Sequence, residues 1–272
     1  MKDSPRFVNI EWGARTVRIE HQWVGTASRD VPLIVFLHEG LGSLAMWKDF
    51  PRQLCAAAGC RGLVYSRPGY GRSTPRPKDE DLPIDFMHVQ AYEVLPALFA
   101  ALKLDTQAHP PWLLGHSDGG SIALLFAAGF ASRVAGLIVL APHIVVEERS
   151  VASIDAARLD YLQGNLRQRL APYHDDADSA FWGWNRAWLA PEFRAWSIAA
   201  EITTIRCPVL AVQGVDDEYG TLEQIRGIAK ALPQTELLAL ESCGHSPQRD
   251  RPAELIQAAT RFIRQHSPGG PP

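Results

Sequence analysis

Residues 111–121 read PWLLGHSDGGS, and residues 122–130 continue as IALLFAAGF. The first apolar run predicts a buried strand over 111–117, and the second predicts a helix over 118–130. A Gly-x-Ser-x-Gly pattern at such a junction is typical of a tight, strained turn, because glycines let backbone segments approach closely. The turn would lift the Ser117 hydroxyl beside the free N–H groups that begin the helix. Ser117 is therefore the candidate nucleophile; the alternative is a glycine-rich turn with an incidental serine.

Buried strands alternate with helices on both sides of this stretch. Residues 6–24 alternate polar and apolar side chains around a glycine, which predicts an antiparallel hairpin. Apolar runs predict further strands over 31–40, 60–69, 133–143, 207–214 and 235–242. Helical spacing of apolar residues predicts helices over 43–59, 85–104 (with a kink at Pro96), 221–232 and 252–266. This alternation predicts an α/β fold with a mostly parallel central sheet flanked by helices.

Residues 145–203 differ from the rest of the chain. They contain no buried-strand run, read as several helices, and include Trp182, Trp184, Trp188 and Trp196. A helical insertion after the sixth strand predicts a cap over the carboxyl edge of the sheet, where ligands bind in open α/β folds. We therefore expect a core formed by 1–144 and 204–266, a helical cap over 145–203, and a disordered tail over 267–272.

Composition narrows the function classes. The chain has 272 residues, a formal net charge of −3 and a pI of about 6.3, which argues against nucleic acid and membrane surfaces as partners. Its four cysteines are scattered and form no zinc-like pattern, so we expect reduced core residues and no metal. The first residues lack an apolar leader, and no apolar run is long enough to span a membrane, so we expect a cytoplasmic protein. The sequence leaves open a homodimer.

A serine alcohol needs a general base, and the base needs an acid to orient it. Downstream of Ser117, two adjacent aspartates follow the strand over 207–214, and His245 follows the strand over 235–242. In a parallel sheet these strand ends share one edge with Ser117. Asp216 and Asp217 are neighbours, so only one of the two carboxylates can face His245.

Several motifs occur in the order found in one enzyme family: HEG at 38–40, SRPGYGRS at 66–73, GHSDGG, GVDD at 214–217 and GHSPQRDRP at 244–252. The chain resembles the α/β-hydrolase fold superfamily, capped and cofactor-independent, over nearly its whole length. This resemblance implies a triad of Ser117, Asp217 and His245, because the family acid usually comes three residues after the strand-ending glycine. It implies an oxyanion hole formed by the N–H groups of Gly40 and Asp118. Glu39 replaces the glycine that is common in the family.

Glu39 and Asp118 place carboxylates on the two loops that would stabilise an oxyanion. A bare negative charge there would oppose the reaction, so each carboxylate must be paired or directed away. One hypothesis is that Arg67 or Arg72 pairs with one of them and braces both loops. The alternatives are that both carboxylates face solvent, or that one binds a cationic substrate group, as in related enzymes that cleave amino-acid esters.

The remaining histidines and tryptophans have weaker signals. His143 follows the strand over 133–143 near the expected mouth of the site and is a candidate substrate contact. His38 and His116 are expected to make structural hydrogen bonds, and His21 and His174 are expected at the surface or in loops. Most of the cap tryptophans should pack the cap, while one or two, with Trp182 and Trp184 as candidates, should line an apolar pocket.

The sequence therefore predicts a serine hydrolase that cleaves small carboxylic esters or related acyl substrates through an acyl-enzyme. No metal or organic cofactor is implied. The same residues on this fold also serve C–C bond hydrolysis of aromatic ring-fission products and acyl transfer. A non-catalytic receptor that keeps the fold is the alternative from a different class. The dehalogenase and epoxide hydrolase branches use an aspartate nucleophile, so Ser117 disfavours them.

Overall fold

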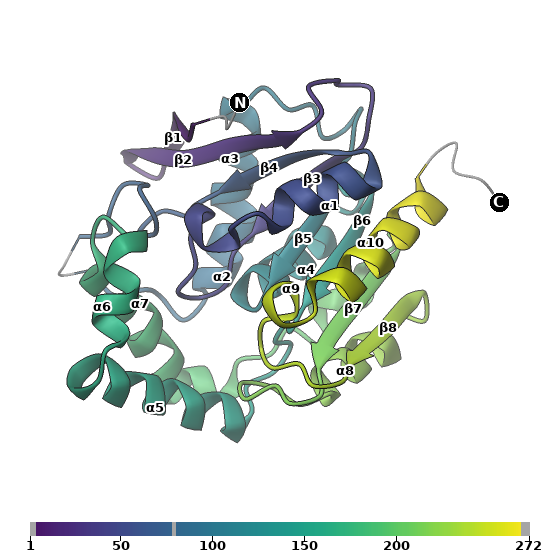
Figure 1. Ribbon diagram of the computed structural model, residues 1–272. Coiled ribbons are helices and arrows are strands. Elements are labelled where there is room, and N and C mark those ends of the chain that lie inside the picture. The colour runs from purple at the N-terminus through teal and green to yellow at the C-terminus, as the bar shows by residue number, and fades with distance from the viewer. Residues whose placement is uncertain (1–3, 78–79, 268–272) are drawn as a thin grey trace.

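A computed structural model describes residues 4–77 and 80–267. Within these residues, eight strands form one sheet in the order β1-β2-β4-β3-β5-β6-β7-β8 (Figure 1). The strands β1 and β2 pair antiparallel, as do β2 and β4, and all other neighbours are parallel. The predicted hairpin and mostly parallel sheet are confirmed. The strands span Arg6–Trp12 (β1), Arg15–Gly25 (β2), Leu33–Leu37 (β3), Arg61–Tyr65 (β4), Trp112–His116 (β5), Gly136–Leu140 (β6), Val209–Gly214 (β7) and Thr235–Leu240 (β8).

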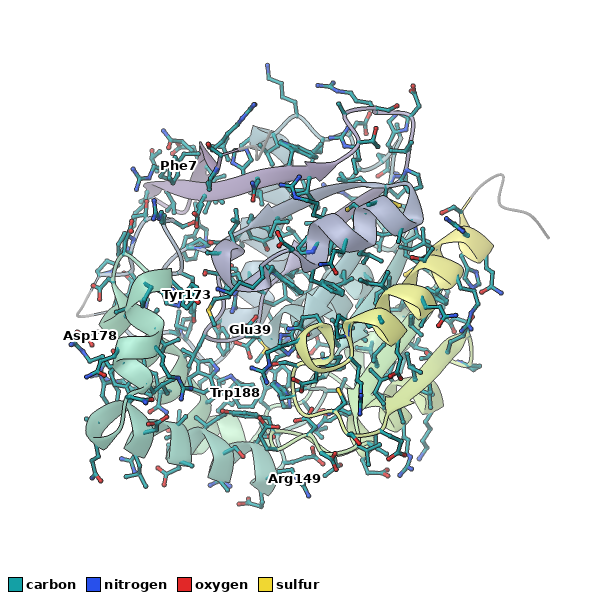
Figure 2. All side chains as sticks on the ribbon, in the orientation of Figure 1. Phe7, Glu39, Arg149, Tyr173, Asp178 and Trp188 are labelled. Carbon is teal, nitrogen blue, oxygen red and sulfur yellow. The ribbon has the colours of Figure 1, made fainter. Side chains whose placement is uncertain are left out.

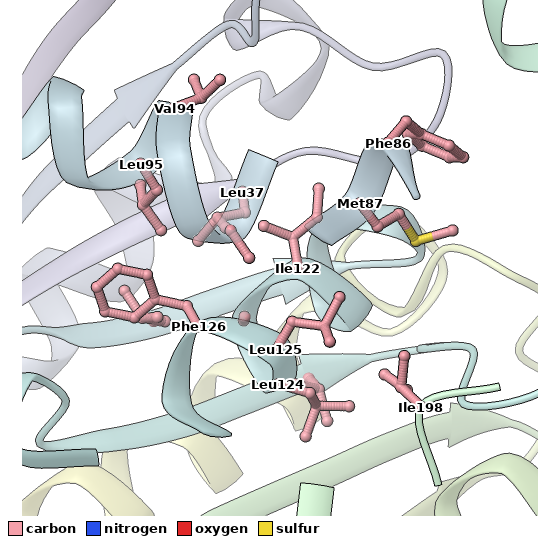
Figure 3. Packing of buried hydrophobic residues seen from close by; sticks show 14 of the residues in the cluster. Leu37, Phe86, Met87, Val94, Leu95, Ile122, Leu124, Leu125, Phe126 and Ile198 are labelled. Atoms are coloured by element: carbon pink, nitrogen blue, oxygen red, sulfur yellow. The ribbon is translucent and has the colours of Figure 1, made fainter. Parts of the chain in front are cut away.

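Alternating residues of the central strands bury two separate cores, because successive side chains of a strand point to opposite faces. On β3, Val35 and Leu37 join the core beneath α3 (Leu95–Ala101) and α4 (Asp118–Gly129), part of which Figure 3 shows. Ile34 and Phe36 join the core beneath α1 (Phe50–Ala58) and α10 (Pro252–His266), which lie together on the other face (Figure 1). The sheet is thus covered on both faces, as predicted. The other helices of the core are α2 (Phe86–Val89), α8 (Glu223–Ala231) and α9 (Pro247–Asp250).

Two predicted helices differ from the observed ones. The helix predicted over 43–59 is a short 3₁₀ helix, Leu44–Trp47, followed by α1, so a single continuous helix was wrong. Lys48 separates the two with a φ of 52°, in the left-handed region that an α-helix cannot contain. The helix predicted over 85–104 is continuous from α2 to α3 but includes a π-helical turn, Gln90–Val94, just before Pro96. Such a turn accommodates the missing N–H of the proline.

The predicted cap, residues 145–203, lies between β6 and β7 and is helical. Its helices are α5 (Glu148–Gln163), α6 (Leu166–Leu170) and α7 (Ala177–Leu189), followed by 3₁₀ turns at Pro191–Ala195 and Glu201–Thr204. Figure 1 shows them grouped at one end of the sheet. Figure 2 shows Trp188 on the cap where the cap meets the core, and Arg149 on α5. Of the predicted disordered tail, 267–272, all but Ser267 lies outside the described residues.

Two further properties concern the described residues alone. No helix among them combines the length and apolar character that crossing a bilayer requires. All four cysteines lie within the described part of the chain and are free thiols; three are buried and Cys207 is half-buried. Burial raises the pKa of the Cys55 thiol to about 12 and that of Cys60 to about 11.

Candidate active site

Ser117 lies in a strained turn between β5 and α4. Its φ of 53° and ψ of −120° fall outside the regions that ordinary residues adopt. Gly115 and Gly119 flank it, and a side chain at either position would collide with nearby backbone. A Cβ on Gly115 would lie 2.1 Å from the carbonyl oxygen of Gly119, and a Cβ on Gly119 would lie 2.1 Å from that of Leu37. The Gly-x-Ser-x-Gly pattern thus meets a steric requirement of this turn.

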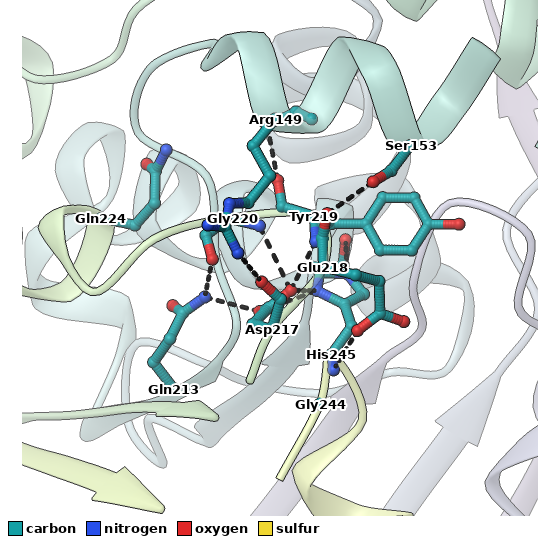
Figure 4. Close-up of polar contacts among 12 residues, drawn as sticks. Arg149, Ser153, Gln213, Asp217, Glu218, Tyr219, Gly220, Gln224, Gly244 and His245 are labelled. Atoms are coloured by element: carbon teal, nitrogen blue, oxygen red, sulfur yellow. Dashed lines mark hydrogen bonds and ion pairs between the residues drawn. The ribbon is translucent and has the colours of Figure 1, made fainter. Parts of the chain in front are cut away.

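The structure brings Ser117, His245 and Asp217 into one hydrogen-bonded chain. Ser117 Oγ lies 2.9 Å from His245 Nε2. The other ring nitrogen, His245 Nδ1, lies 2.9 Å and 3.0 Å from the carboxylate oxygens of Asp217 (Figure 4). Because the carboxylate is the acceptor on the Nδ1 side, Nδ1 carries the proton and Nε2 is free to accept one from the serine hydroxyl.

Asp217 is fully buried and its carboxylate is hydrogen-bonded on all sides. Oδ1 accepts from the N–H groups of Tyr219 (2.8 Å) and Gly220 (3.2 Å), and Oδ2 accepts from Gln213 Nε2 at 2.5 Å. Burial raises the pKa of Asp217, but the hydrogen bond and charge of His245 and the Tyr219 N–H outweigh it and lower the pKa below its usual value. The residue therefore stays ionised, as an orienting acid requires.

The neighbours of Asp217 have different positions. Asp216 is exposed, so of the adjacent aspartates only Asp217 faces His245. Glu218 also has an exposed side chain, yet its Oε2 accepts the backbone N–H of His245 at 3.1 Å. Glu218 thus ties the loop that carries Asp217 to the loop that carries His245, which the sequence did not indicate (Figure 4).

Gly40 and Asp118 present unused backbone N–H groups. Among the hydrogen bonds of the described residues, none is donated by the N–H of either residue. Asp118 is the first residue of α4, where helix geometry leaves N–H groups without an intrahelical acceptor. Gly40 packs against Trp184 of the cap: a Cβ on Gly40 would lie 2.1 Å from the indole Nε1. The Trp184 ring therefore covers the loop that carries one proposed oxyanion donor.

The Asp118 side chain is paired on both of its oxygens. Its Oδ2 lies 3.7 Å from Arg67 Nη2, and its Oδ1 accepts from Trp188 Nε1 at 3.2 Å. Arg67 Nη2 also donates to the backbone carbonyl of Glu39 at 2.8 Å, and its guanidinium stacks 4.7 Å from the centre of the Tyr70 ring. Burial raises the pKa of Asp118 against the pull of Arg67 and Trp188.

This geometry supports the brace proposed from the sequence, with Arg67 as the cation. Arg67 joins the loop of Gly40 to the residue after Ser117, and Trp188 connects the same carboxylate to the cap. The exposed Arg72 uses its backbone instead, donating its N–H to Glu20 at 3.0 Å.

Glu39 directs its carboxylate toward His116, with Oε2 lying 3.4 Å from His116 Nδ1. His116 Nε2 in turn donates to the backbone carbonyl of His245 at 2.6 Å. Burial raises the pKa of Glu39, but the hydrogen bond and charge of His116, together with His38, outweigh it and lower the pKa to about 2. Glu39 and His116 therefore connect the loop of Gly40 to the loop of His245. Neither solvent exposure nor substrate contact is needed to explain Glu39 and Asp118.

Other histidines hold the same loops. His38 Nδ1 donates to the Glu39 carbonyl at 2.7 Å and Nε2 accepts the Arg67 N–H at 3.0 Å, so the ring is neutral. Burial and the nearby Arg67 lower the pKa of His38 well below its usual value. His174 of the cap accepts the N–H of Gly71 and donates to the Leu41 carbonyl, both at 3.0 Å. The surface or loop position predicted for His21 was wrong, because His21 is a buried residue of β2. His174 does lie in a loop, but its ring is buried.

Of the predicted pocket residues, His143 and Trp184 lie near the site, whereas Trp182 packs within the cap. The His143 ring lies 5.8 Å from that of His245 and 4.9 Å from that of Trp188, measured between centroids. Burial, and then the charge of His245, lower the pKa of His143 to about 3, so it is neutral. Its Nδ1 is buried without a hydrogen-bond partner. Trp184 covers Gly40, whereas Trp182 contacts Tyr161, Phe181 and Arg186 within the cap and is not brought to Ser117.

Within residues 4–77 and 80–267, no group of three or more His, Cys, Asp or Glu side chains is arranged to hold a metal ion. The side chains that hydrogen bonds bring together at this sheet edge are those of a serine, an imidazole and a carboxylate.

The amino-acid sequence of the chain matches the model of a known protein family. The sequence model of the Alpha/beta hydrolase family matches residues 34–258, which is most of the chain. The chain belongs to that family, as the order of its motifs predicted.

One curated relative and two solved structures are similar to this chain. The 2-hydroxy-6-oxononadienedioate/2-hydroxy-6-oxononatrienedioate hydrolase of Burkholderia vietnamiensis is 21% identical over 96% of both chains. The structure of a thermophilic esterase from Thermogutta terrifontis superposes with a TM-score of 0.75 at 18% identity, covering 97% of this chain and all of the esterase. An enol-lactonase from Burkholderia xenovorans gives a TM-score of 0.71 at 19% identity, covering 94% of this chain and 99% of the lactonase. These structural likenesses define the fold.

Proposed function

We propose that the protein is a serine hydrolase that cleaves small carboxylic esters or related acyl substrates through an acyl-enzyme. The observation that carries the proposal is the unbroken chain from Ser117 through His245 to the buried Asp217, with contacts of 2.9 Å on both sides of the imidazole. Nucleophile, base and orienting acid are each within hydrogen-bond reach of the next, which is the geometric criterion for an activated serine.

The mechanism follows from the proton positions. Ser117 Oγ attacks the substrate carbonyl carbon while its proton passes to His245 Nε2, and Asp217 stabilises the imidazolium through Nδ1. The negative charge that forms on the carbonyl oxygen is stabilised by the N–H groups of Gly40 and Asp118. The imidazolium then protonates the leaving alcohol, which leaves an acyl-enzyme. A water molecule, deprotonated by His245, hydrolyses it and releases the carboxylic acid.

C–C bond hydrolysis is the second candidate. The observation in its favour is the similarity to the Burkholderia vietnamiensis hydrolase, whose name specifies 2-hydroxy-6-oxo dienoate substrates, over nearly the whole of both chains. The same side chains serve both reactions up to the point at which a carbon rather than an oxygen leaves. A dienone ring-fission product therefore belongs in any substrate screen.

The deciding experiment is a spectrophotometric panel of p-nitrophenyl esters of increasing acyl length, amino-acid esters and a dienone ring-fission product. The control is Ser117→Ala. Ester turnover that disappears in the alanine variant supports the proposal. Preferred turnover of the dienone assigns the second candidate. Ester turnover that persists in Ser117→Ala contradicts the mechanism, and the absence of any turnover or serine labelling in the wild type favours a non-catalytic receptor.

The proposal includes three features from the sequence. The substrate is a small molecule rather than a nucleic acid or a membrane, the protein is cytoplasmic, and a homodimer remains open. Cell fractionation tests the location, and light scattering at several protein concentrations tests the oligomeric state. Binding of duplex DNA or anionic vesicles at physiological salt would contradict the first feature.

A further inference from the structure

The loop that carries Asp217, residues 217–221, lies against the first turns of the cap helix α5. Figure 4 shows Arg149 and Ser153 of α5 reaching this loop from the side opposite His245. The contacts are hydrogen bonds from side chains to consecutive backbone carbonyls. Arg149 Nη1 donates to the carbonyl of Asp217 at 2.9 Å, and Ser153 Oγ donates to that of Glu218 at 2.5 Å.

Two more residues complete this contact. Ser150, which is fully buried, donates its hydroxyl to the carbonyl of Tyr219 at 2.6 Å. Glu147, just before α5, accepts from the backbone N–H of Thr221 at 2.8 Å and from its hydroxyl at 2.6 Å. Gln224 Nε2 also donates to Glu147, at 2.8 Å. The cap therefore makes hydrogen bonds to successive peptide groups of the loop. A contact made only for packing would need no such hydrogen bonds.

Among the described residues, no backbone N–H donates to the carbonyls of Asp217, Glu218 or Tyr219. A loop carbonyl that is not fixed by a partner can rotate, and such rotation would move the Asp217 carboxylate relative to the imidazole. The N–H groups of Tyr219 and Gly220 that hold Oδ1 of Asp217 share peptide groups with the carbonyls of Glu218 and Tyr219, which Ser153 and Ser150 bond. Arg149 bonds the carbonyl of Asp217 itself, on the main chain from which the carboxylate projects. Fixing the carbonyls therefore also fixes the donors that orient the carboxylate.

We propose that Arg149, assisted by Ser150 and Ser153, is a positioning residue that holds the Asp217 loop so that the carboxylate faces His245. The cap is then part of the catalytic machinery as well as a cover over the substrate. This inference rests on the proposed function, since it concerns how the same acid is held. It assigns to the cap a task on the acid side of the imidazole, remote from the oxyanion donors.

The cap is also linked to the nucleophile side. Asn185 of α7 donates to the Ile154 carbonyl of α5 at 3.1 Å, and Trp188 of α7 donates to Asp118. The residue after Ser117 and the loop of Asp217 are thus connected through α7 and α5. A displacement of the cap would reach both ends of the Ser117–His245–Asp217 chain.

The test compares Arg149→Met and Arg149→Lys with Arg158→Met. Arg158 is the matched control because it is also an exposed arginine of α5, and it pairs only with Asp155 of its own helix. For each variant, kcat, KM and the pH profile of kcat/KM are measured with the best p-nitrophenyl ester. The charged and titratable groups that face His245 are unchanged in all three variants: Asp217, Asp118, Glu218, Tyr219, His116 and His143.

The expected result for Arg149→Met is a fall in kcat of about tenfold with KM nearly unchanged, the size of one lost hydrogen bond in the transition state. The acidic limb of the kcat/KM profile should move to lower pH, because a misplaced carboxylate stabilises the imidazolium less. Arg149→Lys, which keeps a donor, should recover most of the loss, and Arg158→Met should match the wild type.

Two results would overturn the inference. One is an Arg149→Met variant that matches Arg158→Met in kcat and pH profile. The other is a loss of kcat with an unmoved acidic limb and no recovery in Arg149→Lys, which would assign Arg149 a structural role only. If Arg149→Met does not fold, Ser150→Ala removes one hydroxyl and provides the same comparison. The outcome is independent of the Ser117→Ala control, which tests whether the turnover is serine-dependent at all.

Discussion

Arg67 Nη2 lies 3.7 Å from Asp118 Oδ2, and each side chain is only 1% exposed. This buried ion pair joins the loop after β4 to the residue that follows the candidate nucleophile. It answers why a carboxylate can occupy that position: Arg67 compensates its charge, and its backbone N–H donates to no acceptor among the described residues.

Replacing Arg67 by Met should destabilise the fold, because Asp118 would be left buried without a cation. We expect the free energy of unfolding to fall by about 3 kcal/mol. The matched control is Arg15→Met, which breaks the exposed pair with Glu80 and should cost less than about 1 kcal/mol. Urea unfolding of both variants checks the difference. Equal losses of unfolding free energy would show that the buried pair stabilises the fold no more than the exposed pair does.

Glu39 should make stability depend on acid pH. Its pKa of about 2 lies below the ordinary 4.5, so the stabilisation is complete above about pH 4.5 and is lost as the pH falls toward 2. The shift corresponds to about 3 kcal/mol at most. Between about pH 5 and about pH 3, the free energy of unfolding of Glu39→Gln should therefore fall less steeply than that of the wild type. Parallel slopes for the two proteins would refute the pairing of Glu39 with His116.

Gly119 and Gly120 should differ sharply in their tolerance of alanine. A Cβ on Gly119 would lie 2.1 Å from the Leu37 carbonyl oxygen, whereas one on Gly120 would lie 3.1 Å from the Pro142 side chain. We expect Gly119→Ala to cost more than about 4 kcal/mol or to prevent folding. Gly120→Ala should stay within about 1 kcal/mol, because alanine also favours the helix. Thermal unfolding measures both, and a well-folded Gly119→Ala would contradict the close approach.

Asp217→Asn should lower kcat roughly 10⁴-fold while KM changes little, because the amide stabilises the wrong imidazole tautomer. Asp216→Asn is the control: the side chain is adjacent in sequence but exposed, and its activity should match that of the wild type. Steady-state kinetics with one ester are sufficient. The reverse pattern would assign the acid to Asp216.

The sequence predicted those features that depend on local pattern and strand order. Ser117, Asp217 and His245 each follow a strand of the parallel part of the sheet, so the sheet necessarily brings them to one edge. The sequence also offered a sign of the role of Gln213, because it is the one polar side chain in the otherwise apolar strand β7. The structure shows it buried and bonded to Asp217. The break at Lys48 had none, because nothing in its neighbourhood favours a left-handed residue.

Contacts between the cap and the core could not be read from the sequence. The bonds of Arg149 to Asp217, Trp188 to Asp118 and His174 to Gly71 span 68, 70 and 103 residues. They depend on the angle at which the cap helices cross the sheet edge, which helical periodicity does not specify. For the same reason Trp182 and Trp184 looked equivalent, although only Trp184 reaches the loop of Gly40.

The central claim is that Ser117 is a nucleophile activated by His245 and Asp217. The most direct measurement is intact-protein and peptide mass spectrometry after treatment with a fluorophosphonate, run in parallel on the wild type, Ser117→Ala and Asp217→Asn. We predict one adduct per chain, located on Ser117, together with loss of ester turnover, much slower labelling of Asp217→Asn and none of Ser117→Ala. An unlabelled Ser117 in an active wild-type enzyme, or an adduct on another residue, would contradict the account.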